Sequence, residues 1–279
     1  MRDGVKVSIV CNTYNHENYI EQALHGFLMQ KTTFPFEILI HDDASTDGTP
    51  TIIRQFKRLY PDIIQPIYET ENQYSKGVSI SRSFQYPRAK GKYMALCEGD
   101  DYWIDEYKLQ LQYNALEEHP EIDICSHGAL VINNEEKITR TIEPYENQCV
   151  IPVSKVILGG GGYVATNSIF IRSSLNINYP EFRKILDLDY AVQIHGSLRG
   201  GMLYLPQLMS VYRENSSGSW SSRIKNNTEM LRTHRERIYK MLKKLDDETN
   251  GKYKKEIYYK IVIGKLKTIL ETVYRKIAH

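Results

Sequence analysis

The chain has 279 residues, enough for one large domain or for a domain with an appendage, and its net charge of +2 excludes little. It contains no apolar stretch that could span a bilayer and no apolar leader at its start, so we expect a cytoplasmic protein. The four cysteines are widely spaced, which predicts neither a zinc pair nor a disulfide framework. No Gly-x-Gly-x-x-Gly or Walker loop follows the first expected strand, which argues against dinucleotide dehydrogenases and P-loop kinases.

Polar residues stand at the end of two expected strands near the start of the chain. Apolar patterns predict strands over residues 5–10 and 36–41, each followed by a helix. The second strand runs into Asp42 and Asp43. The polar residues that follow the first strand are Asn12, Thr13, Tyr14 and Asn15. Because ligands bind at the carboxyl ends of parallel strands, we expect these side chains to open onto one cleft.

A third expected strand, over residues 92–97, leads into three carboxylates within four residues. They belong to Glu98, Asp100 and Asp101. Clustered carboxylates repel one another, and a fold keeps them at a strand end when a cation or polar ligand compensates their charge. One interpretation is a divalent metal that carries a phosphorylated ligand. The other is a solvated acidic turn in which Asp101 caps the next helix.

Together these three segments resemble the family-2 glycosyltransferases of the GT-A fold, in which the motifs have this order and spacing. The resemblance covers residues 5–220. It implies an α/β protein with a Rossmann-like, mostly parallel sheet flanked by helices, followed here by a helical C-terminal appendage. It also implies an inverting transfer from a UDP-sugar, with Asp43 on the uracil ring beside Asp42 and the segment of residues 12–15.

The resemblance also assigns roles to the acidic segment. The Asp-x-Asp motif of the family is present here as Glu98-x-Asp100, which departs from the family at its first position. We expect Asp100 and Asp101 to hold the metal, Mn²⁺ or Mg²⁺, and Glu98 to make an outer contact with the donor.

An inverting transfer needs a base, because the acceptor hydroxyl must lose its proton as it attacks the anomeric carbon. Asp187 and Asp189 are candidates at the start of an expected helix, a position where acidic residues are commonly caps. The resemblance places the base at Asp189, which precedes Tyr190 as in the matching family segment. Asp187 is the runner-up.

Two later segments add to the expected site. The four glycines of residues 159–162 either let the backbone approach a ligand or strand closely or form a simple flexible loop, and a strand is expected after them over residues 166–171. Residues 210–213 and 218–221 resemble a family subgroup whose loop closes over the diphosphate. On that resemblance Arg213 neutralises phosphate and Trp220 covers the donor. Alternatively, Arg213 pairs with a carboxylate and Trp220 packs in the core.

Positive charge gathers toward the C-terminus. Residues 223–279 carry 16 Lys and Arg against 7 Asp and Glu, whereas the remainder carries 20 against 27. Helical patterns with a break at Asn250-Gly251 predict a hairpin there. We therefore expect a GT-A domain over residues 1–222 and a basic helical region over residues 223–279. The hairpin either packs on the domain or docks anionic lipid, and no recognition motif indicates nucleic acid.

The sequence thus predicts a metal-assisted inverting glycosyltransferase with Asp189 as general base. It would move a hexosyl or N-acetylhexosaminyl group from a UDP-sugar to a saccharide or a lipid-linked saccharide. It would act in the cytoplasm, at the inner face of the membrane if the hairpin contacts lipid. A catalytically silent nucleotide-sugar-binding module is an alternative that the presence of Asp189 and the Asp100-Asp101 pair disfavours. A nucleotidyltransferase is disfavoured because the loop after the first strand lacks glycine and basic residues.

Overall fold

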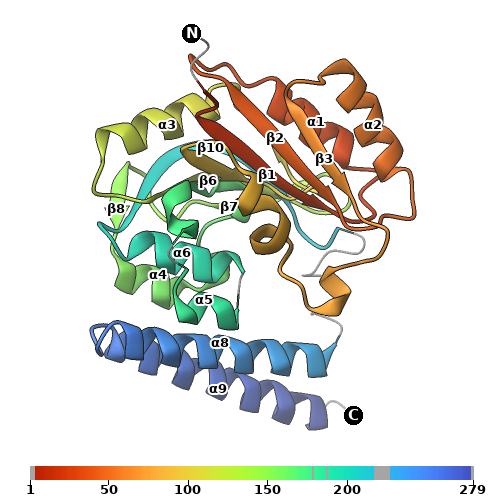
Figure 1. Ribbon diagram of the computed structural model, residues 1–279. Helices are drawn as coiled ribbons and strands as arrows, with labels where there is room; N and C mark the ends of the chain where they lie inside the picture. Colours follow the sequence, from red (N-terminus) through yellow and green to blue (C-terminus); the bar gives the residue numbers. More distant parts are fainter. Residues whose placement is uncertain (1–3, 178, 187, 217–226, 278–279) are drawn as a thin grey trace.

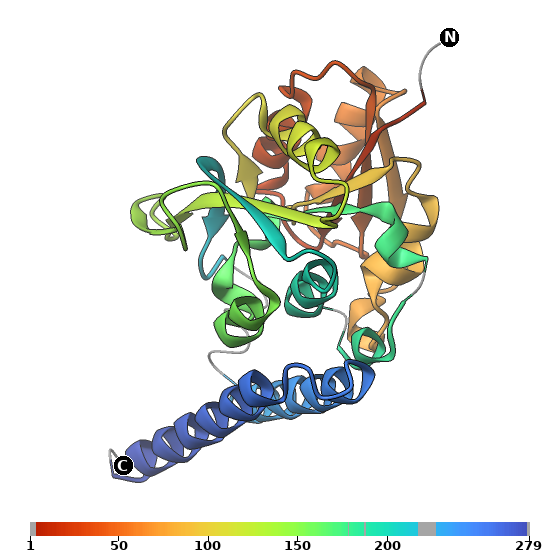
Figure 2. The same cartoon turned by 90° about the vertical axis from the view of Figure 1, so that its left-hand side faces the viewer.

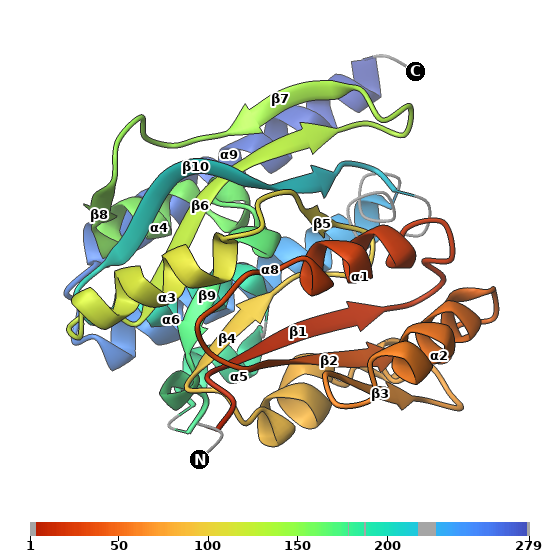
Figure 3. The ribbon, with the colours of Figure 1, turned by 90° about the horizontal axis from the view of Figure 1, so that it is seen from above.

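A ten-stranded mixed sheet runs through the computed structural model, which describes residues 4–177, 179–186, 188–216 and 227–277. The strand order is β3-β2-β1-β4-β9-β6-β10-β5, with β7 paired to β6 and β8 paired to β10 (Figure 3). The strands are β1 (Val7–Thr13), β2 (Phe36–Asp42), β3 (Ile64–Tyr68), β4 (Tyr93–Leu96), β5 (Tyr102–Trp103), β6 (Ile124–Ile132), β7 (Ile138–Ile142), β8 (Cys149–Ile151), β9 (Phe170–Arg172) and β10 (Met202–Arg213).

Six of the described strands point the same way, which confirms the expectation of a mostly parallel sheet. β1 pairs in parallel with β2 on one side and with β4 on the other, and β2 pairs in parallel with β3. β9 runs antiparallel to both β4 and β6, so β6 and its parallel neighbour β10 share the direction of β4. The carboxyl ends of β1, β2 and β4 therefore meet at one edge of the sheet.

Helices cover both faces of the sheet (Figure 1). The α-helices are α1 (Ile20–Leu28), α2 (Thr49–Leu59), α3 (Lys108–Glu118), α4 (Val153–Gly159), α5 (Glu181–Ile185), α6 (Asp189–Ser197), α8 (Thr228–Glu248) and α9 (Lys254–Ile277). Short helical turns are formed by Tyr74–Lys76, Ser81–Gln85, Tyr86–Arg88, Gly161–Tyr163, Thr166–Ser168 and Ser173–Asn176. The buried side chains of α1, α2 and α3 gather in one hydrophobic cluster, and those of α4, α5 and α6 gather in another.

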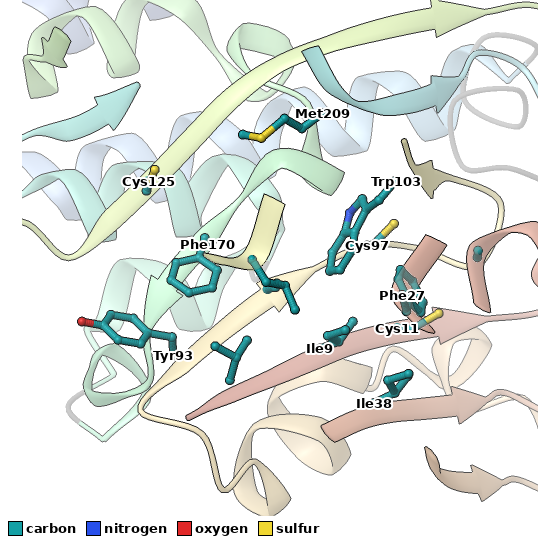
Figure 4. Packing of buried hydrophobic residues seen from close by; sticks show 14 of the residues in the cluster. Ile9, Cys11, Phe27, Ile38, Tyr93, Cys97, Trp103, Cys125, Phe170 and Met209 are labelled. Carbon is teal, nitrogen blue, oxygen red and sulfur yellow. The ribbon is translucent and has the colours of Figure 1, made fainter. Parts of the chain in front are cut away.

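Alternation along β1 sends its side chains into these two cores. Ile9 and Cys11 are fully buried in the first core, whereas Val10 belongs to the second. Figure 4 shows the first core, where the rings of Phe27 and Trp103 meet edge to face with centroids 4.8 Å apart. Because β1 is packed on both faces, its carboxyl end is held by the rigid part of the fold.

The C-terminal helices form a hairpin on the far side of α4, α5 and α6 from the sheet (Figures 1 and 2). Met241, Leu242 and Leu245 of α8 are fully buried in the second core. α8 contacts α5, and α9 contacts α4. Between the helices, Asn250 and Gly251 take positive φ angles of 51° and 74°, at the expected break. The helical appendage is confirmed and packs on the domain, while the division of the chain at residue 222 stays a prediction.

The strand expected over residues 166–171 begins later than the sequence pattern indicated. Thr166–Ser168 form a 3-10 turn, and β9 starts only at Phe170. Ser168 Oγ donates a hydrogen bond to the carbonyl of Ala165 at 2.6 Å, and Asn167 Nδ2 donates to the carbonyl of Val211 at 2.8 Å. Such side-chain bonds to the main chain compete with strand pairing.

Replacement of Leu245 by alanine tests whether the hairpin is packed on the domain in solution. The Leu245→Ala variant should lose about 2–5 kcal/mol of unfolding free energy, because it leaves a cavity in the second core. Leu266→Ala is the matched control on the hairpin, since this side chain is 49% exposed and its loss should change little. Chemical denaturation measures both, and a Leu245→Ala variant as stable as the wild type would contradict the packing.

Candidate active site

The carboxyl ends of β1, β2 and β4 are in direct main-chain contact. The N–H of Gly99 donates to the carbonyl of Asn12 at 2.9 Å, and the N–H of Asp43 donates to the carbonyl of Thr13 at 3.0 Å. A Cβ atom at Gly99 would lie 2.8 Å from the Cβ of Thr13, so only glycine permits this approach. The three segments singled out in the sequence therefore form one site.

Asn12 joins the end of β1 to the acidic segment. Its Nδ2 donates to Ser81 Oγ at 3.0 Å and to Glu98 Oε1 at 3.5 Å. Its Oδ1 accepts a 3.3 Å bond from Gln85 Nε2, which also donates to main-chain carbonyls of β1 and β2. The amide of Asn12 is thus held in one orientation from both ends.

The carboxyl group of Glu98 is influenced by two other acidic side chains, those of Asp100 and Asp189. Burial raises the pKa of Glu98 to about 8, with a further contribution from the charge of Asp100. The hydrogen bond from Asn12 lowers this pKa, and the charge of Asp189 raises it. Thr166, which bonds to Asp189, begins a turn that leads into Ile169, and the carbonyl of Ile169 accepts a 3.0 Å bond from the N–H of Leu96 at the end of β4. The expected base and the acidic segment therefore lie at the same end of β4. A carboxyl group with so high a pKa is a functional-site candidate, because a cation or polar ligand would relieve the repulsion.

Asn15 links the loops that follow β1 and β2. Its φ of 55° turns the chain, and its N–H donates to Ser45 Oγ at 2.8 Å. Its side-chain oxygen accepts a 2.8 Å bond from the N–H of Thr46. Ser45 Oγ in turn donates to Asp42, whose pKa is raised by burial and lowered again by this bond. The polar residues after the two strands are therefore braced against each other.

Asp43 fastens the loop after β3 to the end of β2. Its two carboxylate oxygens accept hydrogen bonds from the N–H groups of Gln73 at 2.7 Å and Tyr74 at 3.0 Å. The residue is only 4% exposed, and His41 Nε2 lies 3.7 Å from Oδ1. Each carboxylate oxygen carries two lone pairs, so these bonds leave acceptor capacity for a further donor. Tyr14, by contrast, is 39% exposed.

The two aspartates of the acidic segment have different surroundings. Asp101 is 2% exposed, and its Oδ1 accepts a 2.8 Å bond from the main-chain N–H of Arg213. Burial raises the pKa of Asp101, as does the charge of Asp100. The side chain of Asp100 is 14% exposed and accepts a 2.6 Å bond from Ser216 Oγ. Of the two expected metal ligands, Asp100 is the more accessible, while Asp101 holds the end of β10.

His16, which the sequence pattern did not single out, joins the expected residue Thr13 at the site. His16 Nε2 lies 4.0 Å from Asp100 Oδ2. Among the described residues, Thr13 Oγ1 and His16 Nδ1 are buried without a hydrogen-bond partner. Burial lowers the pKa of His16, and the charge of Asp100 opposes that effect. Unpartnered buried polar atoms beside a carboxylate fit a site for a polar ligand. The available signal was that His16 directly follows Asn15.

Asp189 opens α6, as the sequence predicts. Its Oδ2 accepts a 2.9 Å bond from Thr166 Oγ1, and its Oδ1 accepts a 2.7 Å bond from the N–H of Tyr190. Burial raises its pKa, and the bonds from Thr166 and Tyr190 lower it. A carboxylate with a raised pKa and a fixed orientation suits a general base. Thr166 has this role only because the 3-10 turn places it there, which the strand prediction did not foresee.

Arg213 packs between two aromatic rings. Its guanidinium lies 5.0 Å from the ring centroids of both Tyr19 and Tyr102, and it pairs with Glu136 at 3.1 Å. The residue is 6% exposed. These contacts match the alternative in which Arg213 pairs with a carboxylate, and a phosphate contact would require them to open. Two predicted site residues lie outside the described residues, Asp187 and Trp220.

Within the described ranges, no group of three or more His, Cys, Asp or Glu side chains could hold a metal ion. The donor set nevertheless fits a cation that binds together with a diphosphate. Mg²⁺ is usually bound by one or two carboxylates, substrate phosphates and water, and does not need a cage of protein ligands. Asp100 supplies such a carboxylate, and the unpartnered atoms of Thr13 and His16 lie beside the preceding residue, Gly99.

A separate cavity of about 690 Å³ lies beside the start of β4 and the end of β9. None of the predicted site residues lines it. The side chains that line it include Arg82, Tyr86, Lys92, Arg172, Asn176 and Tyr179. The acidic segment and Asp189 therefore form a site distinct from this cavity.

Comparison with known proteins agrees with this geometry. Residues 8–177 match the profile of Glycosyl transferase family 2. The chain belongs to this family. An uncharacterised protein of Mycobacterium tuberculosis is 36% identical over 217 residues, which cover 77% of this chain and 61% of that protein. The chain thus spans less than two thirds of this relative. The Escherichia coli UDP-Glc:alpha-D-GlcNAc-diphosphoundecaprenol beta-1,3-glucosyltransferase WfaP is 30% identical over 224 residues, 77% of this chain and 80% of that enzyme.

Solved structures support the same fold. Staphylococcus aureus TarS 1–349 in complex with UDP-GlcNAc has a TM-score of 0.65 at 18% identity, over 87% of this chain and 67% of that one. The mannosyltransferase PcManGT of Pyrobaculum calidifontis, in complex with GDP-Man and Mn²⁺, has a TM-score of 0.57 at 16% identity, over 94% and 73%. At these identities the likeness shows the fold, which is the expected α/β GT-A fold.

The difference between Asp100 and Asp101 can be tested by stability. Asp101→Ala should lose about 1–3 kcal/mol of unfolding free energy, because the buried N–H of Arg213 is left without an acceptor. Asp101→Asn retains an acceptor oxygen and should cost less. Asp100→Ala is the matched control and should change stability little, because the charge repulsion that it removes offsets the loss of the bond from Ser216. Urea denaturation without nucleotide or metal gives these values, and equal losses in the two alanine variants would refute the distinction.

Proposed function

We propose that this chain is an inverting glycosyltransferase that moves a sugar from a UDP-sugar to a saccharide or lipid-linked saccharide. The observation that carries this proposal is the approach of two groups from distant parts of the sequence. Asp189 at the start of α6 accepts a bond from Thr166, which begins a turn that leads into Ile169. The carbonyl of Ile169 accepts a 3.0 Å bond from the N–H of Leu96 at the end of β4, and the charge of Asp189 also raises the pKa of Glu98. A candidate base thus lies at the same end of β4 as a candidate diphosphate site, which is the arrangement that a glycosyl transfer requires.

The donor would bind across the ends of β1 and β2. Asn12, Asp42 and the loop to Asn15 are held by the hydrogen bonds described above, so a nucleoside would meet preorganised polar groups. Asp43 has acceptor capacity left for the N–H of a uracil ring. TarS was crystallised with UDP and with UDP-GlcNAc, and WfaP is named for a UDP-Glc donor. These relatives support a UDP-sugar here.

Asp100 would bind a Mn²⁺ or Mg²⁺ ion together with the diphosphate. When bound, such an ion supplies stabilisation of the negative charge on the leaving group. The structure of PcManGT, a distant structural relative, is a complex with GDP-Man and Mn²⁺. The buried Asp101 would keep Asp100 in place through its bond to β10.

Asp189 would take the proton of the acceptor hydroxyl. Thr166 and the N–H of Tyr190 occupy one lone pair on each carboxylate oxygen, which fixes the carboxylate and leaves the other lone pairs for the acceptor. Its raised pKa makes the proton transfer more favourable than for an ordinary aspartate. The attacking oxygen would then displace UDP from the opposite face of the sugar, so an α-linked donor gives a β-linked product.

Binding of UDP tests the donor and metal sites. Asp100→Ala should weaken UDP binding in Mn²⁺ by about tenfold or more, since a charge-assisted interaction contributes about 1.5–3 kcal/mol. Glu98→Ala should weaken it less. Isothermal titration calorimetry with UDP, and with GDP as the base control, measures both effects. Binding that is unchanged in EDTA and in Asp100→Ala would eliminate the metal site, and equal affinity for GDP would eliminate the uracil contact of Asp43.

The proposed base is tested by the rate of UDP release, measured with the UDP-sugar that the wild type binds best. Asp189→Asn should lower this rate by at least about a hundredfold, the low end for general-base catalysis, with unchanged UDP affinity. In the wild type the rate should fall as the pH drops through the raised pKa of Asp189, because only the ionised carboxylate accepts a proton.

Thr166→Val provides the matched control for this pH dependence. The bond from Thr166 lowers the pKa of Asp189, so its removal should move the acidic limb of the rate profile to higher pH. Near-normal release by Asp189→Asn, or an acidic limb that Thr166→Val leaves in place, would remove Asp189 from this role.

We also propose that the outer surface of the C-terminal hairpin contacts anionic lipid. None of the described helices combines the length and apolarity needed to cross a membrane, so the contact would be peripheral. Tyr258 and Tyr259 are 70% and 59% exposed, and aromatic rings of this kind favour membrane interfaces. WfaP is named for an acceptor linked to diphosphoundecaprenol, which is a lipid. The exposed basic residues of the described hairpin are Arg232, Arg237, Lys240, Lys243, Lys252, Lys254, Lys255 and Lys265.

Co-sedimentation with vesicles tests this surface. The chain should bind phosphatidylglycerol-containing vesicles but not pure phosphatidylcholine, and added salt should weaken the binding. Replacement of Lys252, Lys254 and Lys255 by glutamine should weaken it by about tenfold or more, at about 1 kcal/mol for each charge.

The control is the same number of charges removed elsewhere on the surface. It uses glutamine at three exposed lysines outside the hairpin, Lys31, Lys90 and Lys137. If both triple variants bind equally, or if the wild type ignores anionic vesicles at low salt, the hairpin has only its packing role.

A further inference from the structure

Lys260 of α9 reaches away from the basic outer surface and into the loop after α4. Its Nζ donates a 2.7 Å hydrogen bond to the carbonyl oxygen of Leu158. Leu158 lies in the last turn of α4, where carbonyl groups have no partner within the helix. The same ammonium group lies 6.0 Å from the ring centroid of Tyr190, the residue after the proposed base. The C-terminal hairpin therefore extends a side chain toward the site.

The glycine run of residues 159–162, which we call the glycine loop, is shaped by this contact. Gly160 has a φ of 81°, which disfavours any other residue. A Cβ atom at Gly160 would also lie 2.7 Å from Lys260 Nζ, so the glycine makes room for the lysine. A Cβ at Gly159 would collide with the ring of Tyr163. Of the two interpretations of this run, the described contacts match close approach, here by side chains of the same chain.

The other side of the glycine loop borders Asp189. A Cβ atom at Gly161 would lie 3.5 Å from Asp189 Oδ1, and the carbonyl of Gly161 accepts a 2.9 Å bond from Gln193 Nε2 of α6. The hydroxyl of Tyr190 donates a 2.5 Å bond to the carbonyl of Ile157, just before the loop. Residues 157–161 are thus held between α9 on one side and the N-terminal half of α6 on the other.

We propose that Lys260 is a positioning residue for the transfer reaction, acting through the glycine loop on the orientation of Asp189. The inference rests on the proposed function, because it takes Asp189 as the base. Glycines lose more conformational freedom than other residues when they are ordered, so four in a row need external contacts to hold one conformation. Lys260 supplies such a contact from a hairpin that is otherwise remote from the acidic segment.

The test compares Lys260→Met, Lys260→Arg and Lys155→Met. Methionine keeps the length of the stem but cannot donate to Leu158, whereas arginine can. Lys155 is exposed on α4, the helix that Lys260 contacts, and serves as the matched control. Three readouts are collected: UDP release from UDP-glucose or UDP-GlcNAc with Mn²⁺, UDP affinity by calorimetry, and hydrogen exchange of the amides in residues 159–164.

Lys260→Met should lower kcat by about ten- to a hundredfold, as expected when a catalytic group is displaced by about 1 Å. UDP affinity should stay unchanged, and the amides of the glycine loop should exchange faster. Lys260→Arg should restore most of the rate and the protection, and Lys155→Met should behave as the wild type.

Wild-type kcat and wild-type loop protection in Lys260→Met would overturn the inference. So would a loss of rate that is equal in the methionine and arginine variants while the loop stays protected. A wild-type chain that releases no UDP from either sugar would instead count against the proposed function, and the exchange data would still report whether Lys260 orders the glycine loop.

Discussion

Burial of Glu98 and Asp101 beside Asp100 brings like charges together where solvent cannot screen them, and burial raises the pKa of both buried carboxyl groups. The surrounding structure offsets part of this repulsion with neutral donors, namely the amide of Asn12, the main-chain N–H of Arg213 and the hydroxyl of Ser216. The charge repulsion that these donors do not offset favours a cation or a polar ligand at the accessible carboxylate, Asp100. The position of β1 between β2 and β4, packed on both faces, keeps these groups together while the ligand is absent.

Much of this arrangement follows from the sequence. Strands that lead into Asn12, Asp42 and Glu98 could be predicted because apolar patterns run directly into polar segments, and parallel pairing brings such ends to one edge of the sheet. Asp189 could be placed at the start of a helix for the same kind of reason. A local sequence pattern can predict these positions because each side chain stands where a strand ends or a helix begins.

The rest depends on contacts between distant segments, which a local pattern does not contain. Thr166 was expected in a strand, yet bonds from Ser168 and Asn167 to the main chain make a turn that presents its hydroxyl to Asp189. Asp43 fastens the loop at Gln73, and Arg213 packs between rings from α1 and β5. Lys260 joins α9 to the glycine loop across about a hundred residues of sequence, which only the packing of the hairpin reveals. Each of these contacts fixes the position or the surroundings of a side chain that the sequence identified only as a candidate.

The glycine loop borders Asp189, and Lys260 of the hairpin lies beside Tyr190, the next residue. An inverting transfer with Asp189 as base is the central proposal. The most direct test uses water as the acceptor and follows by ¹H NMR the sugar that the wild type releases from an α-linked UDP-sugar, read before the anomers equilibrate. Inversion with Asp189 as base predicts that the β-anomer forms first and that Asp189→Asn suppresses its formation. Initial release of the α-anomer would mean retention and would contradict the role of Asp189.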